Sequence, residues 1–344
     1  MSRTDAAPAL DVRSYRVEDE PRVLALLEAA MGKGPAGERS PEFFRWKHLD
    51  NPFGPSFMLV AEGDGTIVGF RSFMRWRFQA GGRMVPAVRA VDTATHPEFQ
   101  GRGVFSRLTL EALEALREEA DLVFNTPNEK SLPGYLKMGW RTVGKVPISI
   151  RVRRPIRFAR GLRWRGAPAG ASGVRPPIDA ETAAEALRDE KEVALLLDRA
   201  GGDDQLLSTP RDVEYLRWRY GSARVLDYRA VREQQGDRLT GLAIFRVRPR
   251  GKLWESTVTE VLVPRGDART ARTLLHRVVE AAGVDHVTCH FPAGSAPARG
   301  ARRSGFFRSP GGMTLVVNPL RDDVDTDLTA LGSWALSLGD LEVF

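Results

Sequence analysis

Residues that could hold a phosphate lie in one short loop near the middle of the first half of the chain. The loop, Gln100-Gly101-Arg102-Gly103, follows an extended apolar segment and precedes a helical pattern. Such a helix start presents unpaired backbone N–H groups and the positive end of the helix dipole, which suits a phosphate. Gln100 and Arg102 can add side-chain donors. The loop predicts a phosphate site, and an ordinary strand-to-helix turn is the alternative.

The segment after this loop has the pattern of an amphipathic helix. Apolar residues recur every four positions from Val104 to Leu116, which gives the stripe of a helix packed on a core. Two nucleotide-binding motifs are excluded here. Ser106 stands where a dinucleotide-binding loop has its third glycine, and no Gly-Lys-Ser/Thr sequence follows, as a P-loop requires.

A second motif follows this predicted helix. Asn128 lies seven residues before Tyr135, and the pair Gly139-Trp140 begins four residues after that tyrosine. With Gln100 and Gly103, these residues make the sequence resemble the GNAT superfamily of acyl-CoA-dependent N-acyltransferases. The resemblance implies acetyl-CoA, or another acyl-CoA, as the co-substrate and no metal.

One residue departs from the family pattern. Phe105 stands where the family has a small residue. Bulky apolar residues occur there in the subgroup of the enhanced-intracellular-survival acetyltransferases, to which the sequence is similar. The resemblance places the acyl-CoA on Thr93, Ala94, Thr95, Gln100, Gly101, Arg102, Gly103, Val104, Phe105, Asn128 and Ser131.

The resemblance also implies a mechanism, which is direct attack of an amine on the thioester. Tyr135 would protonate the leaving thiolate, a step worth about 10²- to 10⁴-fold in rate; the alternative is a packing residue. Backbone N–H groups at 93–95 would meet the pantetheine and the thioester carbonyl. Two carboxylates are candidates for the base. Asp92 lies at the end of its strand, and the alternative role for such a residue is to accept hydrogen bonds in a turn. The terminal carboxylate of Phe344 is the second candidate, because a terminal carboxylate is the base in the similar subgroup.

The second half of the chain repeats the first. Trp46 and Gly69 are 23 residues apart, and Trp218 and Gly241 have the same separation. Equal spacing in a shared order indicates duplication of one fold, with chance similarity as the alternative. We therefore expect an α/β (α+β) chain of two tandem GNAT folds, each a mixed, mostly antiparallel sheet flanked by helices. The expected parts are a catalytic domain at 1–150, a basic linker at 151–178 and a degenerate domain at 179–344.

The second copy departs from the first where chemistry is expected. Its loop at 265–267 has a single glycine, and Asp267 would place a carboxylate near the phosphates, which repels them. Ala301 stands where the motif has its tyrosine. We expect this copy to have lost its acyl-CoA site and to contribute to the acceptor cleft.

The composition does not indicate a membrane, disulfide-linked or nucleic-acid-binding protein. The chain has 344 residues, 42% of them hydrophobic, and no apolar run near the roughly 20 residues of a membrane helix. A single cysteine, Cys289, excludes an intrachain disulfide, and the start lacks a secretory signal, so we expect a cytoplasmic protein. The net charge of +7, from 51 basic and 44 acidic residues, does not indicate nucleic-acid binding.

Three functions fit these residues. The first is acetyl transfer to a primary amine of a small molecule, such as an amino sugar, polyamine or aminoglycoside. The second is a non-catalytic acyl-CoA or carbohydrate-binding regulator on the same paired fold. The third is an aminoacyl-tRNA-dependent transferase, supported only by eight arginines within 151–175. The expected partner is a small-molecule amine, and a homo-oligomeric state is left open.

Overall fold

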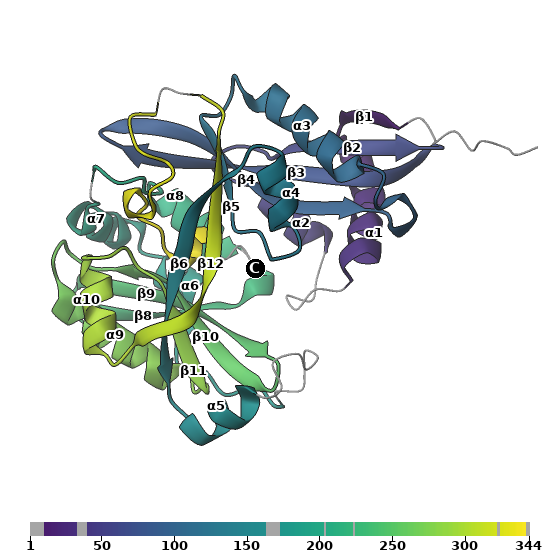
Figure 1. Ribbon diagram of the computed structural model, residues 1–344. Helices are drawn as coiled ribbons and strands as arrows, with labels where there is room; N and C mark the ends of the chain where they lie inside the picture. The colour runs from purple at the N-terminus through teal and green to yellow at the C-terminus, as the bar shows by residue number, and fades with distance from the viewer. Residues whose placement is uncertain are drawn as a thin grey trace, which may run out of the picture. The chain divides into compact units, whose positions relative to one another are not determined.

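The chain forms two compact units that interleave along the sequence. The computed structural model describes residues 10–32, 40–162, 173–202, 204–222, 224–321 and 324–341. The first unit comprises Met1–Arg77, Val85–Arg141 and Val316–Val324, and the second comprises Phe78–Met84, Thr142–Leu315 and Asp325–Phe344. Figure 1 shows the elements by label and colour.

The first unit is built on a mixed sheet with strand order β1-β2-β3-β4-β5-β12. The β4–β5 pair is parallel, whereas the pairs β1–β2, β2–β3 and β5–β12 are antiparallel. The strands are β1 (Asp11–Ser14), β2 (Phe57–Gly63), β3 (Thr66–Ala80), β4 (Arg83–Thr95), β5 (Leu122–Asn125) and the end of β12 (Phe307–Pro319). The helices are α1 (Glu20–Met31), α2 (Pro41–His48), α3 (Val104–Leu116) and α4 (Leu132–Lys137), with short 3₁₀ turns at Val17–Asp19 and Pro97–Phe99.

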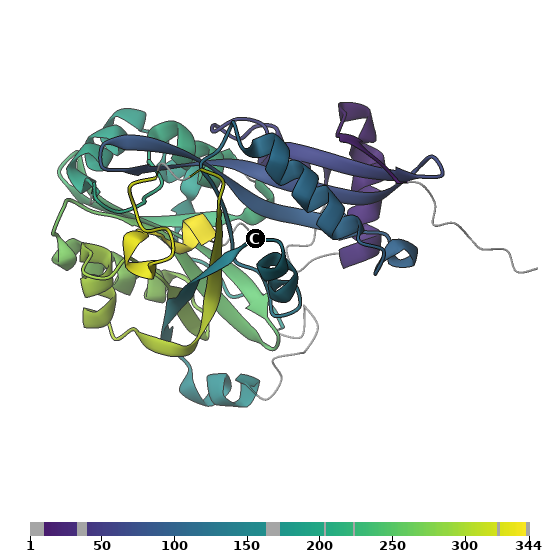
Figure 2. The same cartoon turned by 45° about the horizontal axis from the view of Figure 1, so that its top comes forward.

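Helices cover both faces of this sheet. Side chains alternate along β2, so Met58 and Val60 pack with α1 while Leu59 and Ala61 pack with α3. Figures 1 and 2 both show α3 lying along the strands.

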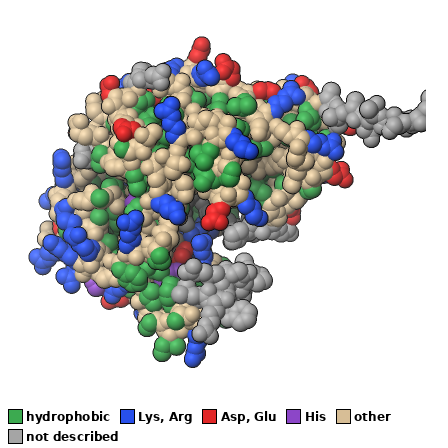
Figure 3. All heavy atoms as spheres, viewed as in Figure 1, with side chains coloured by type: hydrophobic (Ala, Val, Ile, Leu, Met, Phe, Trp, Pro, Cys, Tyr) green, Lys and Arg blue, Asp and Glu red, His purple; other side chains and the backbone are tan. Residues whose placement is uncertain are grey.

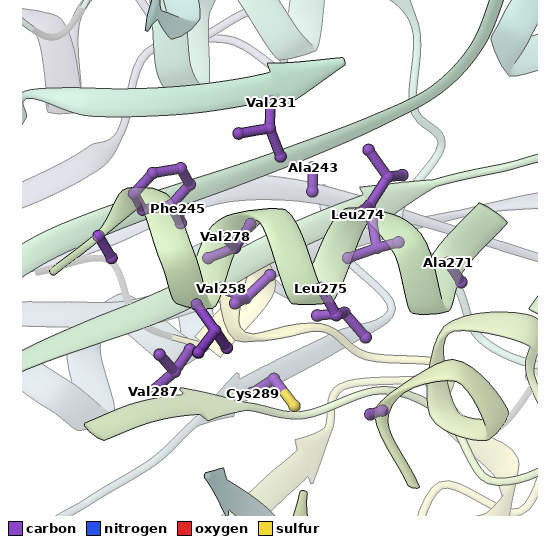
Figure 4. Close-up of a cluster of buried hydrophobic side chains, with 14 of the residues drawn as sticks. Val231, Ala243, Phe245, Val258, Ala271, Leu274, Leu275, Val278, Val287 and Cys289 are labelled. Atoms are coloured by element: carbon purple, nitrogen blue, oxygen red, sulfur yellow. The ribbon is translucent and has the colours of Figure 1, made fainter. Parts of the chain in front are cut away.

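The second unit has the strand order β12-β6-β11-β10-β9-β8-β7. Its strands are β6 (Arg141–Val152), β7 (Glu181–Thr182), β8 (Tyr228–Gln235), β9 (Arg238–Arg250), β10 (Leu253–Leu262) and β11 (His286–Cys289), beside the first part of β12. Its helices are α5 (Pro155–Leu162), α6 (Ala183–Ala186), α7 (Glu190–Ala200), α8 (Val213–Leu216), α9 (Ala268–Ala281), α10 (Ala296–Arg303) and α11 (Leu338–Leu341). A π-helical turn at Arg217–Ser222 and 3₁₀ turns at Arg224–Leu226 and Leu331–Ser333 complete it. Figure 4 shows the core, where Leu274, Leu275 and Val278 of α9 lie among side chains of the neighbouring strands.

A shared irregularity relates the two units. In the first unit the register shifts between the pairs Ala61↔Gly69 and Glu62↔Ile67, and in the second it shifts between Glu233↔Gly241 and Gln234↔Leu239. The bulge therefore recurs at Gly69 and Gly241, the positions that the sequence repeat aligns. A bulge at matching positions is a feature of one fold present twice.

The predicted α/β (α+β) class, with mixed and mostly antiparallel sheets flanked by helices, is confirmed. The division at 1–150, 151–178 and 179–344 stays a prediction. Over the described residues, no helix combines the length and apolar character needed to cross a bilayer. Basic side chains are scattered over much of the face in Figure 3, with fewer acidic ones among them.

Candidate active site

The loop before α3 leaves its backbone donors accessible. Gly101 and Gly103 have φ angles of 76° and 78°, in the left-handed region that glycine tolerates. Gly103 is the N-cap of α3, where no side chain caps the helix and no acidic residue lies in the first turn. The first N–H groups of a 13-residue helix are thus left for an anion.

Beside this loop, the parallel pair β4–β5 stops before β4 does. The two strands pair from Ala87↔Leu122 to Arg89↔Phe124, while β4 continues to Thr95. The end of β4, including residues 93–95, therefore extends past the stretch that pairs with β5. Backbone groups at such a place can pair with an extended ligand instead of a strand.

The side chains of the loop have partners of their own. Gln100 Nε2 lies 3.4 Å from the carbonyl oxygen of Thr95, and the guanidinium of Arg102 lies 5.0 Å from the ring centre of Phe99. Gln100 thus ties the loop to the end of β4. Both side chains are exposed, so either can turn toward a ligand.

The predicted residues Asn128 and Ser131 form the turn that starts α4. Asn128 Oδ1 accepts hydrogen bonds from the N–H of Lys130 at 3.0 Å and of Ser131 at 2.9 Å. Ser131 Oγ donates to the same oxygen at 3.1 Å. Asn128 therefore fixes the helix that carries Tyr135.

Tyr135 is buried among aromatic rings. Its side chain is 4% exposed, and its ring meets Phe105 edge-on at 5.6 Å and Trp140 at 5.0 Å between ring centres. Phe105, the bulky residue that departs from the family pattern, thus packs against the ring of Tyr135. Arg71 Nη2 donates a hydrogen bond of 3.0 Å to the Tyr135 hydroxyl.

Asp92 is held by two buried basic side chains of α2. Lys47 Nζ lies 2.7 Å and His48 Nε2 lies 2.9 Å from Asp92 Oδ2. Although burial alone would raise it, the pKa of Asp92 lies well below its usual range because of the Lys47 charge and the His48 hydrogen bond. Burial lowers the pKa of His48, so this ring is neutral at physiological pH.

Three residues at this site were not anticipated from the sequence: Lys47, His48 and Arg71. Lys47 and His48 lie in α2, far along the chain from Asp92, and a Lys-His pair at a helix end carries no signal. Arg71 does carry one, because a charged residue stands inside the apolar run of β3. Charged side chains are rarely fully buried, so an arginine in such a run is a sign of a special role.

The second unit differs at the matching place. The N-terminus of α9 is capped by Asp267, whose carboxylate accepts from Thr270 N at 2.9 Å and Thr270 Oγ1 at 2.7 Å. A cavity of about 650 Å³ lies beside the end of β10, lined by Glu260 and Arg211 among others. Burial raises the pKa of Glu260. The helix α9 is therefore capped by a carboxylate, where an anion site needs free donors.

The structure brings together the loop, the end of β4, Asn128, Ser131 and Tyr135 in the first unit. Phe344 lies outside the described residues, so its predicted role stays a prediction. Within the described part of the chain, no group of three or more His, Cys, Asp or Glu residues could hold a metal ion.

Part of the chain is similar in sequence to a known family. Residues 11–143 match the family model described as acetyltransferase (GNAT) domain. A sequence comparison with curated proteins gives no significant match.

Solved structures share the fold over most of the chain. A conserved protein of unknown function from Enterococcus faecalis V583, a probable N-acyltransferase, has a TM-score of 0.61 at 14% identity, covering 91% of this chain and 73% of that one. A GCN5-related N-acetyltransferase from Anabaena variabilis ATCC 29413 has a TM-score of 0.60 at 14% identity, with coverage of 91% and 73%. Eis1 from Mycobacterium abscessus has a TM-score of 0.52 at 15% identity, with coverage of 91% and 74%. Residues 11–143 are thus similar in sequence to the GNAT acetyltransferase domain, and the chain shares its fold with solved GCN5-related N-acetyltransferases.

Proposed function

We propose that the protein transfers an acyl group, most readily acetyl, from acyl-CoA to a primary amine of a small molecule or amino sugar. One contrast carries the proposal. The N-cap of helix α3 is Gly103, which has no side chain to cap the helix, whereas the corresponding helix α9 is capped by the side chain of Asp267. An anion can take the place of a cap only in the first unit.

In this proposal the co-substrate runs from the loop to Tyr135. The N–H groups at the start of α3 take the diphosphate, with Gln100 and Arg102 turning toward it. Backbone groups of Thr93, Ala94 and Thr95 take the pantetheine arm and the thioester carbonyl. Asn128 and Ser131 act through the turn that they form, by holding α4 in place.

Tyr135 is the proposed acid. The amine attacks the thioester carbon, the C–S bond breaks, and the hydroxyl of Tyr135 gives its proton to the departing sulfur. Burial among Phe105 and Trp140 keeps water away from this hydroxyl. Asp92 serves as the anchor of Lys47 and His48, because a carboxylate whose pKa is held so low takes up a proton poorly.

Calorimetric titration with acetyl-CoA tests the proposal. Gly103 and Gly266 both have positive φ, 78° and 85°, and a Cβ at either would meet no atom within 4 Å. Gly103→Val and Gly266→Val therefore impose similar backbone strain in the two units. We expect one site per chain, lost in Gly103→Val and retained in Gly266→Val.

Two results would contradict the proposal. Absence of acetyl-CoA binding in the wild type would exclude an acetyl-CoA transferase, and equal loss in both variants would place the site elsewhere. Tyr135→Phe separates an enzyme from a regulator. An enzyme loses turnover with primary amines while it still binds acetyl-CoA, whereas a regulator has no turnover to lose.

A further inference from the structure

Arg71 is a buried guanidinium with unused donors. It lies on β3, its exposed fraction is 1%, and one of its nitrogens, Nη2, donates to Tyr135. Its other two nitrogens, Nε and Nη1, are buried without a hydrogen-bond partner. Buried polar groups in proteins are normally paired, so this arrangement calls for an explanation.

Aromatic rings compensate only part of the cost of burying this charge. The guanidinium carbon lies 4.5 Å from the ring centre of Phe73, 5.4 Å from that of Phe105 and 5.5 Å from that of Tyr135. Each cation–π contact is worth about 0.5–2 kcal/mol, whereas burying an ion costs several kcal/mol. Among the described residues no carboxylate forms an ion pair with Arg71, so its field is not neutralised. That field falls on the hydroxyl of Tyr135.

The hydrogen bond also sets the direction of the tyrosine proton. A guanidinium has donors and no acceptor, so Tyr135 must accept from Arg71 with an oxygen lone pair. The O–H of Tyr135 therefore points away from Arg71. A hydroxyl fixed in this way is oriented to give its proton to another group.

We propose that Arg71 is a positioning residue that aims the hydroxyl of Tyr135 and stabilises the phenolate formed during acyl transfer, an inference that rests on the proposed function. When the C–S bond breaks, its electron pair goes to sulfur, which takes the proton of Tyr135. The phenolate oxygen then accepts a charge-assisted hydrogen bond from Arg71. The surplus proton on the new amide nitrogen passes to the phenolate, which restores Tyr135. Because the charge is present before the reaction, it acts without reorganisation.

The variant Arg71→Met removes the charge and keeps an unbranched apolar side chain. We expect kcat with acetyl-CoA, and with the best amine among glucosamine, spermidine and an aminoglycoside, to fall roughly 10- to 100-fold. The KM for acetyl-CoA should change little, since Arg71 acts on proton transfer. Arg71→Lys should recover part of the loss. Arg75→Met, the same change in the same strand at an arginine paired with Glu119, should keep wild-type turnover.

A stability measurement separates positioning from structural support. Replacing a buried, unpaired charge by an apolar side chain is often neutral or stabilising, so Arg71→Met should unfold at no lower urea concentration than the wild type. In a Tyr135→Phe background, Arg71→Met should cause no further loss of kcat. An additive loss there, or a fall in stability that parallels the fall in kcat, would overturn the inference.

A spectroscopic measurement decides the matter even if acetyl transfer fails. The chain has five tyrosines, and the difference between the Raman spectra of the wild type and Tyr135→Phe isolates the ring doublet of Tyr135. The intensity ratio of this doublet reports whether the hydroxyl accepts or donates a hydrogen bond. Among the described residues Arg71 is the charged side chain that hydrogen-bonds to this hydroxyl, and the rings of Phe105 and Trp140 pack beside it. The wild type should show an accepting hydroxyl, and Arg71→Met should lose this signature. An unchanged ratio would overturn the role of Arg71, whereas a changed ratio without acyl transfer would overturn only the proposed reaction.

Discussion

His48 and Asp92 are joined by a hydrogen bond of 2.9 Å between Nε2 and Oδ2, which ties the end of α2 to β4. The other ring nitrogen of His48, Nδ1, lies 2.9 Å from Ser56 Oγ and 3.1 Å from Ser72 Oγ. A neutral ring donates from Nε2 to Asp92 and accepts at Nδ1 from one of the two serine hydroxyls. The end of β4 is therefore joined to α2 by a histidine with polar contacts at both ring nitrogens.

Asp92→Asn should destabilise the first unit. The substitution leaves Lys47, which is 2% exposed, without its carboxylate. Removing one partner of a buried ion pair costs roughly 3–5 kcal/mol. Urea unfolding at neutral pH measures the loss. If stability is unchanged while acyl transfer disappears, Asp92 acts in the reaction and the anchoring role is wrong.

The stability of the protein should depend on His48 between neutral and mildly acidic pH. Its folded pKa is lowered from the ordinary 6.5, so below pH 6.5 the unfolded chain binds a proton that the folded chain does not. Stability then falls as pH falls, by at most about 1.4 kcal/mol per pH unit for this group. His48→Gln should flatten the curve of unfolding free energy between about pH 7 and 5.

The test compares the slopes of unfolding free energy against pH in the wild type and in His48→Gln, because the substitution also changes stability at every pH. His276 and His290 have lowered pKa values too and titrate in both proteins. The difference between the two slopes therefore isolates His48. Parallel curves would mean that His48 carries the same charge in the folded and unfolded states.

The regular parts of the fold could be predicted because their signals are local. The apolar stripe from Val104 sets the start of α3, and the structure places its N-cap at Gly103. The equal separations of Trp46 from Gly69 and of Trp218 from Gly241 predicted the repeated fold. These features depend on residues within one or two elements.

Other features depend on pairings between distant segments. The first unit completes its sheet with Val316–Pro319 of β12, and the second places β6 beside β11, so each unit takes a strand from beyond its own repeat. Nothing in the sequence of a strand specifies which neighbour it pairs with. For the same reason, Arg71 could be recognised as unusual in an apolar strand, but its contact with Tyr135 could not be predicted.

A matched pair of glycines tests which unit binds acyl-CoA. A Cβ at Gly69 would lie 2.6 Å from Val104 Cγ1, and a Cβ at Gly241 would lie 2.8 Å from Thr270 Cγ2. Alanine at either position should cost roughly 1–3 kcal/mol through overpacking. Only Gly69→Ala displaces the start of α3, so it alone should weaken acetyl-CoA binding in calorimetry. Weaker binding in Gly241→Ala would place a site in the second unit.

Arg211→Met should destabilise the second unit, because this side chain joins two buried carboxylates. Arg211 Nε lies 2.9 Å from Glu260 Oε2, and Nη2 lies 2.9 Å from Asp340 Oδ2, so the bridge fastens α11 to β10. Without the arginine the two carboxylates repel, and the free energy of unfolding at neutral pH should fall by roughly 3–5 kcal/mol. The exposed pair between Arg217 and Glu190 provides the control.

Arg217→Met should leave stability nearly unchanged, since exposed ion pairs contribute little. The loss in Arg211→Met should also shrink in mild acid. Burial already raises the pKa of Glu260, and removal of the arginine raises it further, so this carboxylate takes up a proton and the repulsion with Asp340 ends. Urea unfolding of both variants at neutral and acidic pH measures this. A loss in Arg211→Met that is independent of pH would show that packing of its side chain, rather than its charge, holds α11 to the second unit.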